Sequence, residues 1–103
     1  MPFPDGWNTV TITGSYRDLD GMPAAGDVMF VAQGVQVIDG ASVVPRELSA
    51  LLDETGAISI DLPVGDEAIT YAVTERVNNG RPRFLTAISP GMPPTNVHAL
   101  VAL

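Results

Sequence analysis

Apolar and polar residues alternate along several short stretches of this chain, a period of two that is typical of β-strands with one buried face. In Asn8 to Arg17, one face carries Val10, Ile12 and Tyr16, and the other carries threonine and serine. Within Gly26 to Gln33, Val28, Phe30 and Ala32 alternate with Met29 and Val31, an apolar run that predicts a central strand covered on both sides.

Turn-forming residues separate these stretches at the spacing expected of a sandwich. Asp18 to Pro23 contains two aspartates and a glycine, which predicts a hairpin turn between the first two strands. Similar signals predict turns at Asp39-Gly40, Asp53 to Gly56 and Asn78 to Gly80. The other strands are predicted at Val35 to Asp39, Ser42 to Leu52, Ala57 to Leu62, Ile69 to Val77 and Arg83 to Ser89.

At three places the pattern is interrupted or fits more than one type of secondary structure. Gly14 interrupts the inward face of the first strand, which suggests a bulge or a close approach of another backbone. Pro63 lacks an N–H and is expected to end the strand before it. The leucines between Arg46 and Leu52 fit a helical turn or a strand, and we favour the strand because turn signals recur about every 8 to 12 residues.

Together these elements predict an all-β fold. We expect an antiparallel β-sandwich of about seven strands with an Ig-like or prealbumin-like Greek-key topology. A length of 103 residues suits one domain. Its expected parts are an N-terminal arm at residues 1–8, the sandwich at 9–89 and a Pro-rich extended arm at 90–103.

The composition excludes several classes of function. Charged residues make up 17% of the chain, and its formal charge is −7. Nucleic-acid binding needs clustered basic side chains, and the nearest approach is Arg81 with Arg83, so we expect none. Without cysteine there are no disulfides or thiolate metal sites. The N-terminal residues lack a secretory pattern, and no apolar run is long enough to span a membrane.

Both ends of the chain carry apolar residues, which we interpret as contacts for partner proteins. Stacked prolines between Pro90 and Asn96 predict an extended segment that leads to the apolar Val97 to Leu103. An apolar end of this kind needs a neighbouring strand or a partner to cover it. The expected partner-contact residues are Phe3, Trp7, Val97, Leu100, Val101 and Leu103.

His98 is the only histidine, so a Ser-His-Asp or metal-water mechanism would depend on it. It lies in an apolar segment, and there is no second imidazole for a metal site. Asp18 and Asp20 resemble the opening of a calcium loop, but Met29 stands where an EF-hand has its bidentate glutamate. We therefore expect no catalytic residue, no metal and no cofactor.

Acidic side chains are the other candidates for catalysis. A glycosidase pair could come from Asp61, Glu75, Asp66 or Glu67, but the sequence does not place two of them together. Glu75 falls on an otherwise apolar strand face, where an unpaired charge is costly. We expect an arginine partner or an edge position for it.

Trp7 and Tyr16 support an alternative function, a carbohydrate-binding or host-surface adhesion module. An exposed pair of aromatic rings could form a platform on which a sugar stacks. Core packing is the competing interpretation, in which Trp7 holds the N-terminal arm against the sandwich.

Two segments of the chain resemble a known family. Val10 to Phe30 contains a strand with a glycine and then the motif D-x-D-G-x-P at Asp18 to Pro23. Leu52 to Glu75 contains a D-x-x-G turn, an alternating strand that ends in Leu62-Pro63, and the motif Y-x-V-T-E from Tyr71. In this order the motifs resemble a small β-sandwich module of virion proteins of tailed bacteriophages of actinobacteria. A looser likeness extends to transthyretin-like and carboxypeptidase-regulatory-like sandwiches.

The resemblance implies a non-enzymatic structural protein of the virion, either a minor tail or fibre component or a capsid decoration protein. Its implied partners are major capsid or tail subunits and further copies of itself, in a homo-oligomer such as a trimer. The implied location is the virion, assembled in the cytoplasm of the host bacterium. No catalytic residue belongs to the family pattern.

Overall fold

The computed structural model describes residues 8–34, 36–38, 40–44, 46–65, 67–78 and 82–103. A 3₁₀ turn, η1 (Val97–Ala99), follows the last strand, and the described chain is otherwise built of strands and loops, as the sequence predicts. The strands are β1 (Asn8–Ser15), β2 (Gly26–Ala32), β3 (Gln36–Ile38), β4 (Ala41–Val43), β5 (Glu47–Leu51), β6 (Ala57–Val64), β7 (Ile69–Val77), β8 (Arg83–Ile88) and β9 (Thr95–Asn96).

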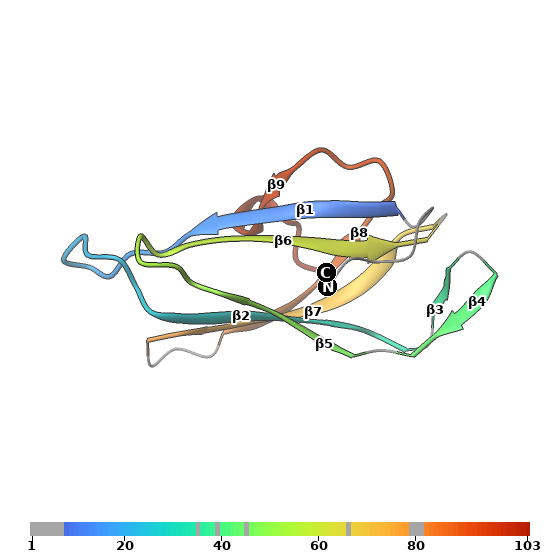
Figure 1. Cartoon of the computed structure of the whole chain (residues 1–103), viewed down its shortest axis with the longest axis horizontal. Helices are drawn as coiled ribbons and strands as arrows, with labels where there is room; N and C mark the ends of the chain where they lie inside the picture. The colour runs from blue at the N-terminus through green and yellow to red at the C-terminus, as the bar shows by residue number, and fades with distance from the viewer. Residues whose placement is uncertain (1–7, 35, 39, 45, 66, 79–81) are drawn as a thin grey trace.

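The strands form two facing sheets and a separate hairpin (Figure 1). One sheet has the order β6-β1-β9, the other has the order β5-β2-β7-β8, and β3 pairs with β4. The β3–β4 hairpin projects from one end of a molecule measuring 48 × 24 × 21 Å (Figure 1). The predicted two-layer all-β arrangement is therefore confirmed. One pair departs from the antiparallel expectation, because β9 runs parallel to β1.

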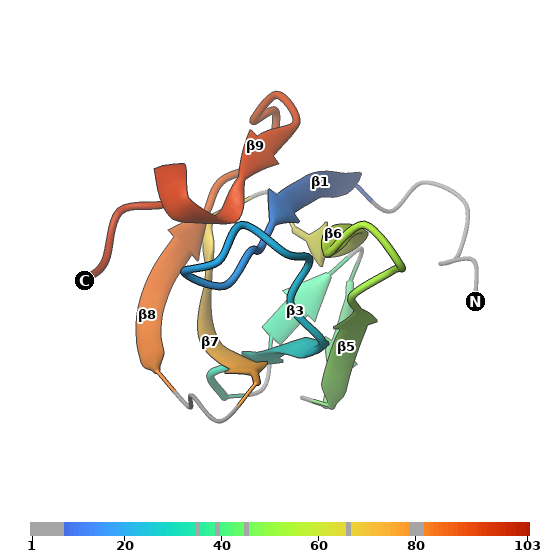
Figure 2. The ribbon, with the colours of Figure 1, turned by 90° about the vertical axis from the view of Figure 1, so that its left-hand side faces the viewer.

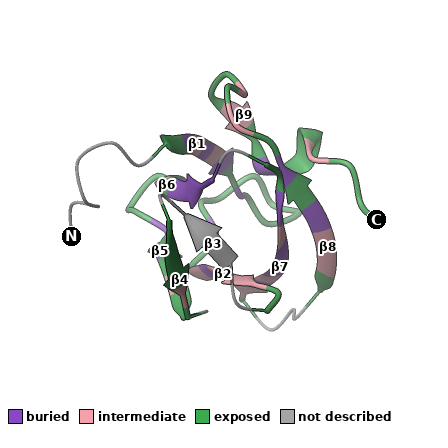
Figure 3. Ribbon diagram, turned by 90° about the vertical axis from the view of Figure 1, so that its right-hand side faces the viewer, coloured by how far each residue is buried: buried purple, intermediate pink, exposed green. Residues whose placement is uncertain are grey.

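The alternation of side chains determines which residues lie between the sheets. Val10 and Ile12 of β1 face Val28 and Phe30 of β2, and all four are buried. Figure 3 shows buried residues along strands of both sheets. The core is completed by Tyr16, Ala24, Ala50, Leu52, Ile58, Leu62, Val64, Ile69, Tyr71, Val73, Ile88 and Val97.

The ambiguous segment before Leu52 forms strand β5. Leu48, Ala50 and Leu52 share one face, with Ala50 and Leu52 buried and Leu48 packed against the core. β5 pairs antiparallel with β2, which places Leu48 opposite Phe30. The strand interpretation is confirmed.

The expectation for β2 is correct in one respect and wrong in the other. β2 is a central strand with β5 and β7 on either side. Its outer face is not fully covered, since Met29 and Val31 are partly exposed. The reason is that a two-layer fold buries only one face of each sheet.

The turn at Asp18 to Pro23 forms, but it joins strands of different sheets. The Asp18 carboxylate accepts hydrogen bonds from the backbone N–H groups of Asp20 and Met22 at 2.9 and 3.0 Å. Pairing between the two arms is limited to a bridge between Arg17 and Pro23, because β1 pairs with β6 and β2 pairs with β7. The hairpin expected here is therefore wrong beyond that bridge.

Gly14 does not form a bulge. The β1–β6 register runs without a break through the pair Gly14 and Ile58. A close approach exists, but it involves side chains: a Cβ on Gly14 would lie 3.0 Å from Cγ1 of Val97 and 3.2 Å from Cγ1 of Ile58.

Pro63 does not end β6, which continues to Val64 at the edge of its sheet. The N–H of Tyr16 donates to the carbonyl of Gly56, so these two residues form a hydrogen-bonded pair. Every second pair along β1 and β6 from that point, up to Asn8 with Val64, exchanges hydrogen bonds in the same way. Pro63 belongs to the pairs in between, whose backbone groups point away from the neighbouring strand. Its carbonyl accepts a hydrogen bond of 2.7 Å from the buried Tyr71 hydroxyl, and burial raises the pKa of that hydroxyl.

Gly56 lies against the backbone of Tyr16, so a substitution at Gly56 tests how closely these two segments pack. It has φ of +80°, and a Cβ there would lie 2.3 Å from the carbonyl oxygen of Tyr16. Gly21 has φ of +82° but no atom within 4 Å of the same position, so it is a matched control. We predict that Gly56→Ala lowers the free energy of unfolding by more than about 3 kcal/mol and Gly21→Ala by about 1 kcal/mol. Urea titrations would measure both, and equal losses would contradict the close approach.

Candidate functional site

The predicted partner-contact residues occupy three different environments. Phe3 and Trp7 lie outside the described residues. Val97 is fully buried in the core, and Leu100 is partly buried against it. Val101 and Leu103 are 75% and 72% exposed. The C-terminal segment is therefore divided: its first part belongs to the sandwich, and its last residues carry the exposed apolar side chains.

His98 and Glu75 form a polar contact that the sequence did not predict. Nε2 of His98 lies 2.9 Å from Oε2 of Glu75, and the side chains are 53% and 12% exposed. A carboxylate can only accept, so Nε2 carries the proton and donates it. The expected arginine partner or edge position for Glu75 is wrong, because its partner is the imidazole and β7 lies between β2 and β8.

Tyr16 completes this polar cluster. Its ring contacts the imidazole of His98 edge to face, with centroids 5.1 Å apart and planes at 71°. The hydroxyl is buried beside the Glu75 carboxylate, and no hydrogen bond with good geometry reaches it from the described residues. Burial, reinforced by the Glu75 carboxylate, raises the pKa of Tyr16.

The cluster of Tyr16, Glu75 and His98 holds the C-terminal segment against the sheets. The side chain of Asn96 accepts a hydrogen bond of 2.9 Å from the backbone N–H of His98, and Thr95 and Asn96 pair with β1. In Figure 2 the segment continues from β9 to the side of β8, where the N–H of Leu103 donates to the carbonyl of Leu85 at 2.8 Å. Among the described residues, no serine or threonine hydroxyl bonds to His98, and the contacts of His98 with Asn96 and Glu75 anchor the segment.

Three other acidic side chains, those of Asp18, Asp53 and Asp61, are engaged in local structure. Asp18 holds its own turn, as described above. Asp53 does the same, accepting from the N–H and the hydroxyl of Thr55 and from the N–H of Ala57, and these hydrogen bonds lower the pKa of Asp53. Asp61 accepts from the hydroxyl of Thr11 at 2.7 Å. Within the described ranges, which leave out Asp66, no group of three metal-ligating side chains is present.

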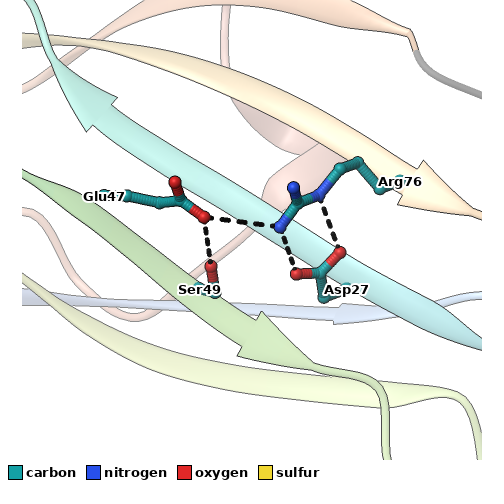
Figure 4. A network of polar contacts seen from close by, with 4 residues as sticks. All are labelled: Asp27, Glu47, Ser49 and Arg76. Atoms are coloured by element: carbon teal, nitrogen blue, oxygen red, sulfur yellow. Dashed lines mark hydrogen bonds and ion pairs between the residues drawn. The ribbon is translucent and has the colours of Figure 1, made fainter.

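An ion-pair network lies on the outer face of the four-stranded sheet (Figure 4). Arg76 donates through Nε and Nη2 to the two carboxylate oxygens of Asp27 at 2.9 and 2.5 Å. Its Nη2 also lies 3.5 Å from Oε1 of Glu47, which accepts a hydrogen bond from the hydroxyl of Ser49. The hydrogen-bonded Asp27 carboxylate raises the pKa of Arg76. This network links β7, β2 and β5 and pairs one positive charge with two negative charges on that face. Predicting it would have required the strand register, which the sequence does not reveal.

Apolar side chains occupy the centre of the same outer face. Val31, Ala72 and Leu85 lie in register across β2, β7 and β8, and Met29 is two residues from Val31 on the same side. None of these four residues belongs to the core between the sheets. Ala72 is only 4% exposed between its neighbours, whereas the other three are partly exposed. We call these four residues the apolar strip.

The outer face of the other sheet is different in kind. Thr9, Thr11, Thr13 and Ser15 alternate with the buried residues of β1, and Ser59 lies opposite Thr13 on β6. These residues are exposed or partly exposed, so this face presents hydroxyl groups to water.

Large apolar side chains are also exposed at separate places outside the apolar strip. They are those of Leu19, Met22, Val44, Leu51, Val101 and Leu103.

Comparisons with known proteins leave the family open. No model of a known protein family matches this chain, and no curated protein sequence matches it. Within the described part of the chain, no helix has the length and apolar character required to cross a membrane. The surface and the polar cluster are thus the basis for a functional proposal.

The pairing of Glu75 with His98 predicts an energetic coupling. Removing the imidazole with His98→Ala leaves a carboxylate that is mostly buried and unpaired, which we expect to cost about 1 to 3 kcal/mol of stability. In the Glu75→Gln background the same substitution should cost less by at least about 1 kcal/mol, because a neutral amide is cheaper to leave unpaired. Urea unfolding of the two single variants and the double variant measures the coupling. Additive losses would show that the contact contributes nothing.

The division of the C-terminal segment predicts a contrast between two valines. Val97→Ala removes two methyl groups from the core and should lower stability by about 2 kcal/mol. Val101→Ala changes an exposed residue and should alter stability by less than about 0.5 kcal/mol. Thermal or urea unfolding would separate the two, and a folded, equally stable chain lacking residues 97–103 would contradict the assignment of Val97 to the core.

Proposed function

We propose that this chain is a non-enzymatic structural protein of a bacteriophage virion that acts through contacts between subunits. The family resemblance of the turn and strand motifs suggests a minor tail or fibre component or a capsid decoration protein. The proposed partners are major capsid or tail subunits and further copies of this chain, and the proposed location is the virion, assembled in the host cytoplasm.

The observation that carries the proposal is the apolar strip on the outer face of the four-stranded sheet. Its four residues lie next to one another across three strands, instead of being scattered singly as exposed apolar residues usually are. Three of the four are partly exposed around the buried Ala72. Partly exposed apolar side chains that are grouped in this way beside polar residues are typical of a protein-protein contact. Arg76 and Glu47 lie near this strip and are already paired, so little free charge opposes a partner that covers it.

The polar cluster supports a structural role rather than catalysis. The only histidine of the chain holds a buried carboxylate and the C-terminal segment at the same time. A histidine in this position stabilises the fold, and the same contacts give it no nucleophile to activate.

The finer fold assignment is also a proposal. Four connections, β1 to β2, β5 to β6, β6 to β7 and β8 to β9, cross from one sheet to the other. Crossing connections of this kind are typical of Greek-key sandwiches and support the Ig-like or prealbumin-like topology.

The adhesion alternative loses one of its two aromatic residues. The ring of Tyr16 is buried against His98 and is not available to stack on a sugar. The remaining candidate, Trp7, lies outside the described residues.

The proposal predicts that the chain is incorporated into virions through its apolar strip. A tagged copy supplied during infection should appear in purified particles, as measured by quantitative mass spectrometry. Val31→Glu adds a charge to the β2 side of the strip and should reduce incorporation at least about tenfold, because burying an unpaired carboxylate costs more than about 1.4 kcal/mol.

Ser59→Glu is the matched control for that experiment. It adds the same charge to the exposed hydroxyl face of the other sheet and should leave incorporation unchanged. Circular dichroism would check that both variants fold. Particles that lack the wild-type chain would overturn the proposal, and glycan-array binding that Trp7→Ala abolishes would favour adhesion instead.

A further inference from the structure

The free edge of β5 presents backbone groups without partners. Residues of β5 alternate between those whose backbone groups face β2 and those whose backbone groups face away from it. The N–H of Leu52 donates to the carbonyl of Gly26, so Leu52, Ala50 and Leu48 face β2. The N–H and C=O groups of the residues in between, Glu47, Ser49 and Leu51, therefore point away from β2. No hydrogen bond within the described residues reaches these groups.

Each of the remaining edges of the two sheets is short or is interrupted at one position. At the β8 edge, the N–H of Leu103 already donates to the carbonyl of Leu85. At the β6 edge, Pro63 has no N–H, and its carbonyl accepts from the Tyr71 hydroxyl. The β9 edge is two residues long. Short strands, proline, covering segments and charged side chains are the usual means of preventing edge pairing. Of these, the five residues of β5 contain only the charge of Glu47, which is paired with Arg76.

We infer that β5 is the contact through which two copies of this chain associate, by antiparallel pairing of the two β5 strands about a two-fold axis at Ser49. The inference rests on the proposed function, since it names one of the subunit contacts that a structural protein would use. Addition of a strand to an exposed edge is an established mode of recognition. The product is one continuous sheet that contains the four strands of each copy.

The register follows from hydrogen bonding and charge. With the axis at Ser49, each Glu47 lies opposite Leu51 of the partner subunit and the two Ser49 residues face each other. Each of these pairs exchanges two N–H···O=C hydrogen bonds, so every outward group of β5 is satisfied. An axis at residue 47 would place the two Glu47 carboxylates opposite each other, and an axis at residue 50 would oppose Glu47 with Asp53. Like charges in directly opposite positions are destabilising.

Side chains at this edge favour the same arrangement. Leu51 is 79% exposed on the outer face, and the partner's Glu47 and Ser49 stems would cover it. Leu48 is only partly buried on the inner face and would gain the partner's Ala50 as a neighbour. Glu47 is held by Arg76, which lowers the repulsion that a free carboxylate at the edge would cause.

Sedimentation velocity of the purified chain tests the pairing. We expect a concentration-dependent dimer between about 1 µM and 1 mM. Leu51→Lys places a charge at the contact and should raise the dimer Kd at least tenfold, which corresponds to about 1.4 kcal/mol. Leu19→Lys introduces the same residue at a fully exposed turn and should leave the Kd unchanged.

Proline substitutions separate edge pairing from folding. Ser49→Pro removes the central outward N–H without taking a donor from the β2 ladder, so the monomer should fold, as circular dichroism would show. The dimer should be lost. Ser59→Pro removes an outward N–H from the β6 edge and should leave dimerisation intact.

A cysteine cross-link tests the register. The chain contains no cysteine, so Ser49→Cys introduces a single thiol. Facing residues of a hydrogen-bonded antiparallel pair have Cα atoms about 5.5 Å apart, which a disulfide can span. Oxidation should give a covalent dimer with Ser49→Cys and none with Ser59→Cys.

The outcomes distinguish this inference from the proposed function. A monomer throughout the concentration range, or a dimer that resists both Leu51→Lys and Ser49→Pro, overturns the β5 pairing. Incorporation into virions would still support the structural role in that case. Conversely, a β5 dimer formed by a chain that never enters particles would uphold the pairing and overturn the virion assignment.

Discussion

The pleat of the strands is the constraint on which this structure depends. Successive side chains point to opposite faces, so burying Val10 and Ile12 on β1 commits the intervening threonines to solvent. The same rule applies to the backbone, where residues alternate between groups that face the neighbouring strand and groups that face away. One alternation thus produces the core, the hydroxyl face, the apolar strip and the free groups of β5. A shift of one residue in register would move every buried side chain of a strand to its outer face and every outer side chain into the core.

The polar cluster of Tyr16, Glu75 and His98 is the exception within this regular pattern. A carboxylate on an inward face needs a partner, and the partner comes from a segment 23 residues later in the chain. Its placement depends on the parallel pairing of β9 with β1 and on Val97, which packs in the core immediately before the histidine. The C-terminal segment therefore stabilises the sandwich as a strand of one sheet and as part of the core. Its hydrogen bond from Leu103 to Leu85 also occupies one position of the β8 edge.

Local patterns predicted the strands and turns because their causes are local. Period-two alternation and the turn chemistry of Asp18 and Gly21 act over a few residues, and even the ambiguous leucines near Leu48 formed the expected strand. The errors concern pairing between distant segments. The continuation of β6 through Pro63 and the partner of Glu75 both depend on which strands are neighbours. No single stretch of sequence carries that information. The burial of Val97 has the same origin: an apolar terminus is compatible with a partner contact or with a place in the core, and only the fold decides between them.

The two outer faces of the sandwich differ in polarity. One side, rich in hydroxyl groups, is easily wetted, while the other carries the apolar strip. Residues that pair directly across neighbouring strands project on the same side of a sheet, so joining two copies through β5 would place both strips on one side of a single broad platform. A partner with two-fold symmetry could then engage both halves together, and two weak contacts would act as one strong attachment. A lone copy would hold such a surface only weakly, so the strength of attachment would depend on how many copies are present.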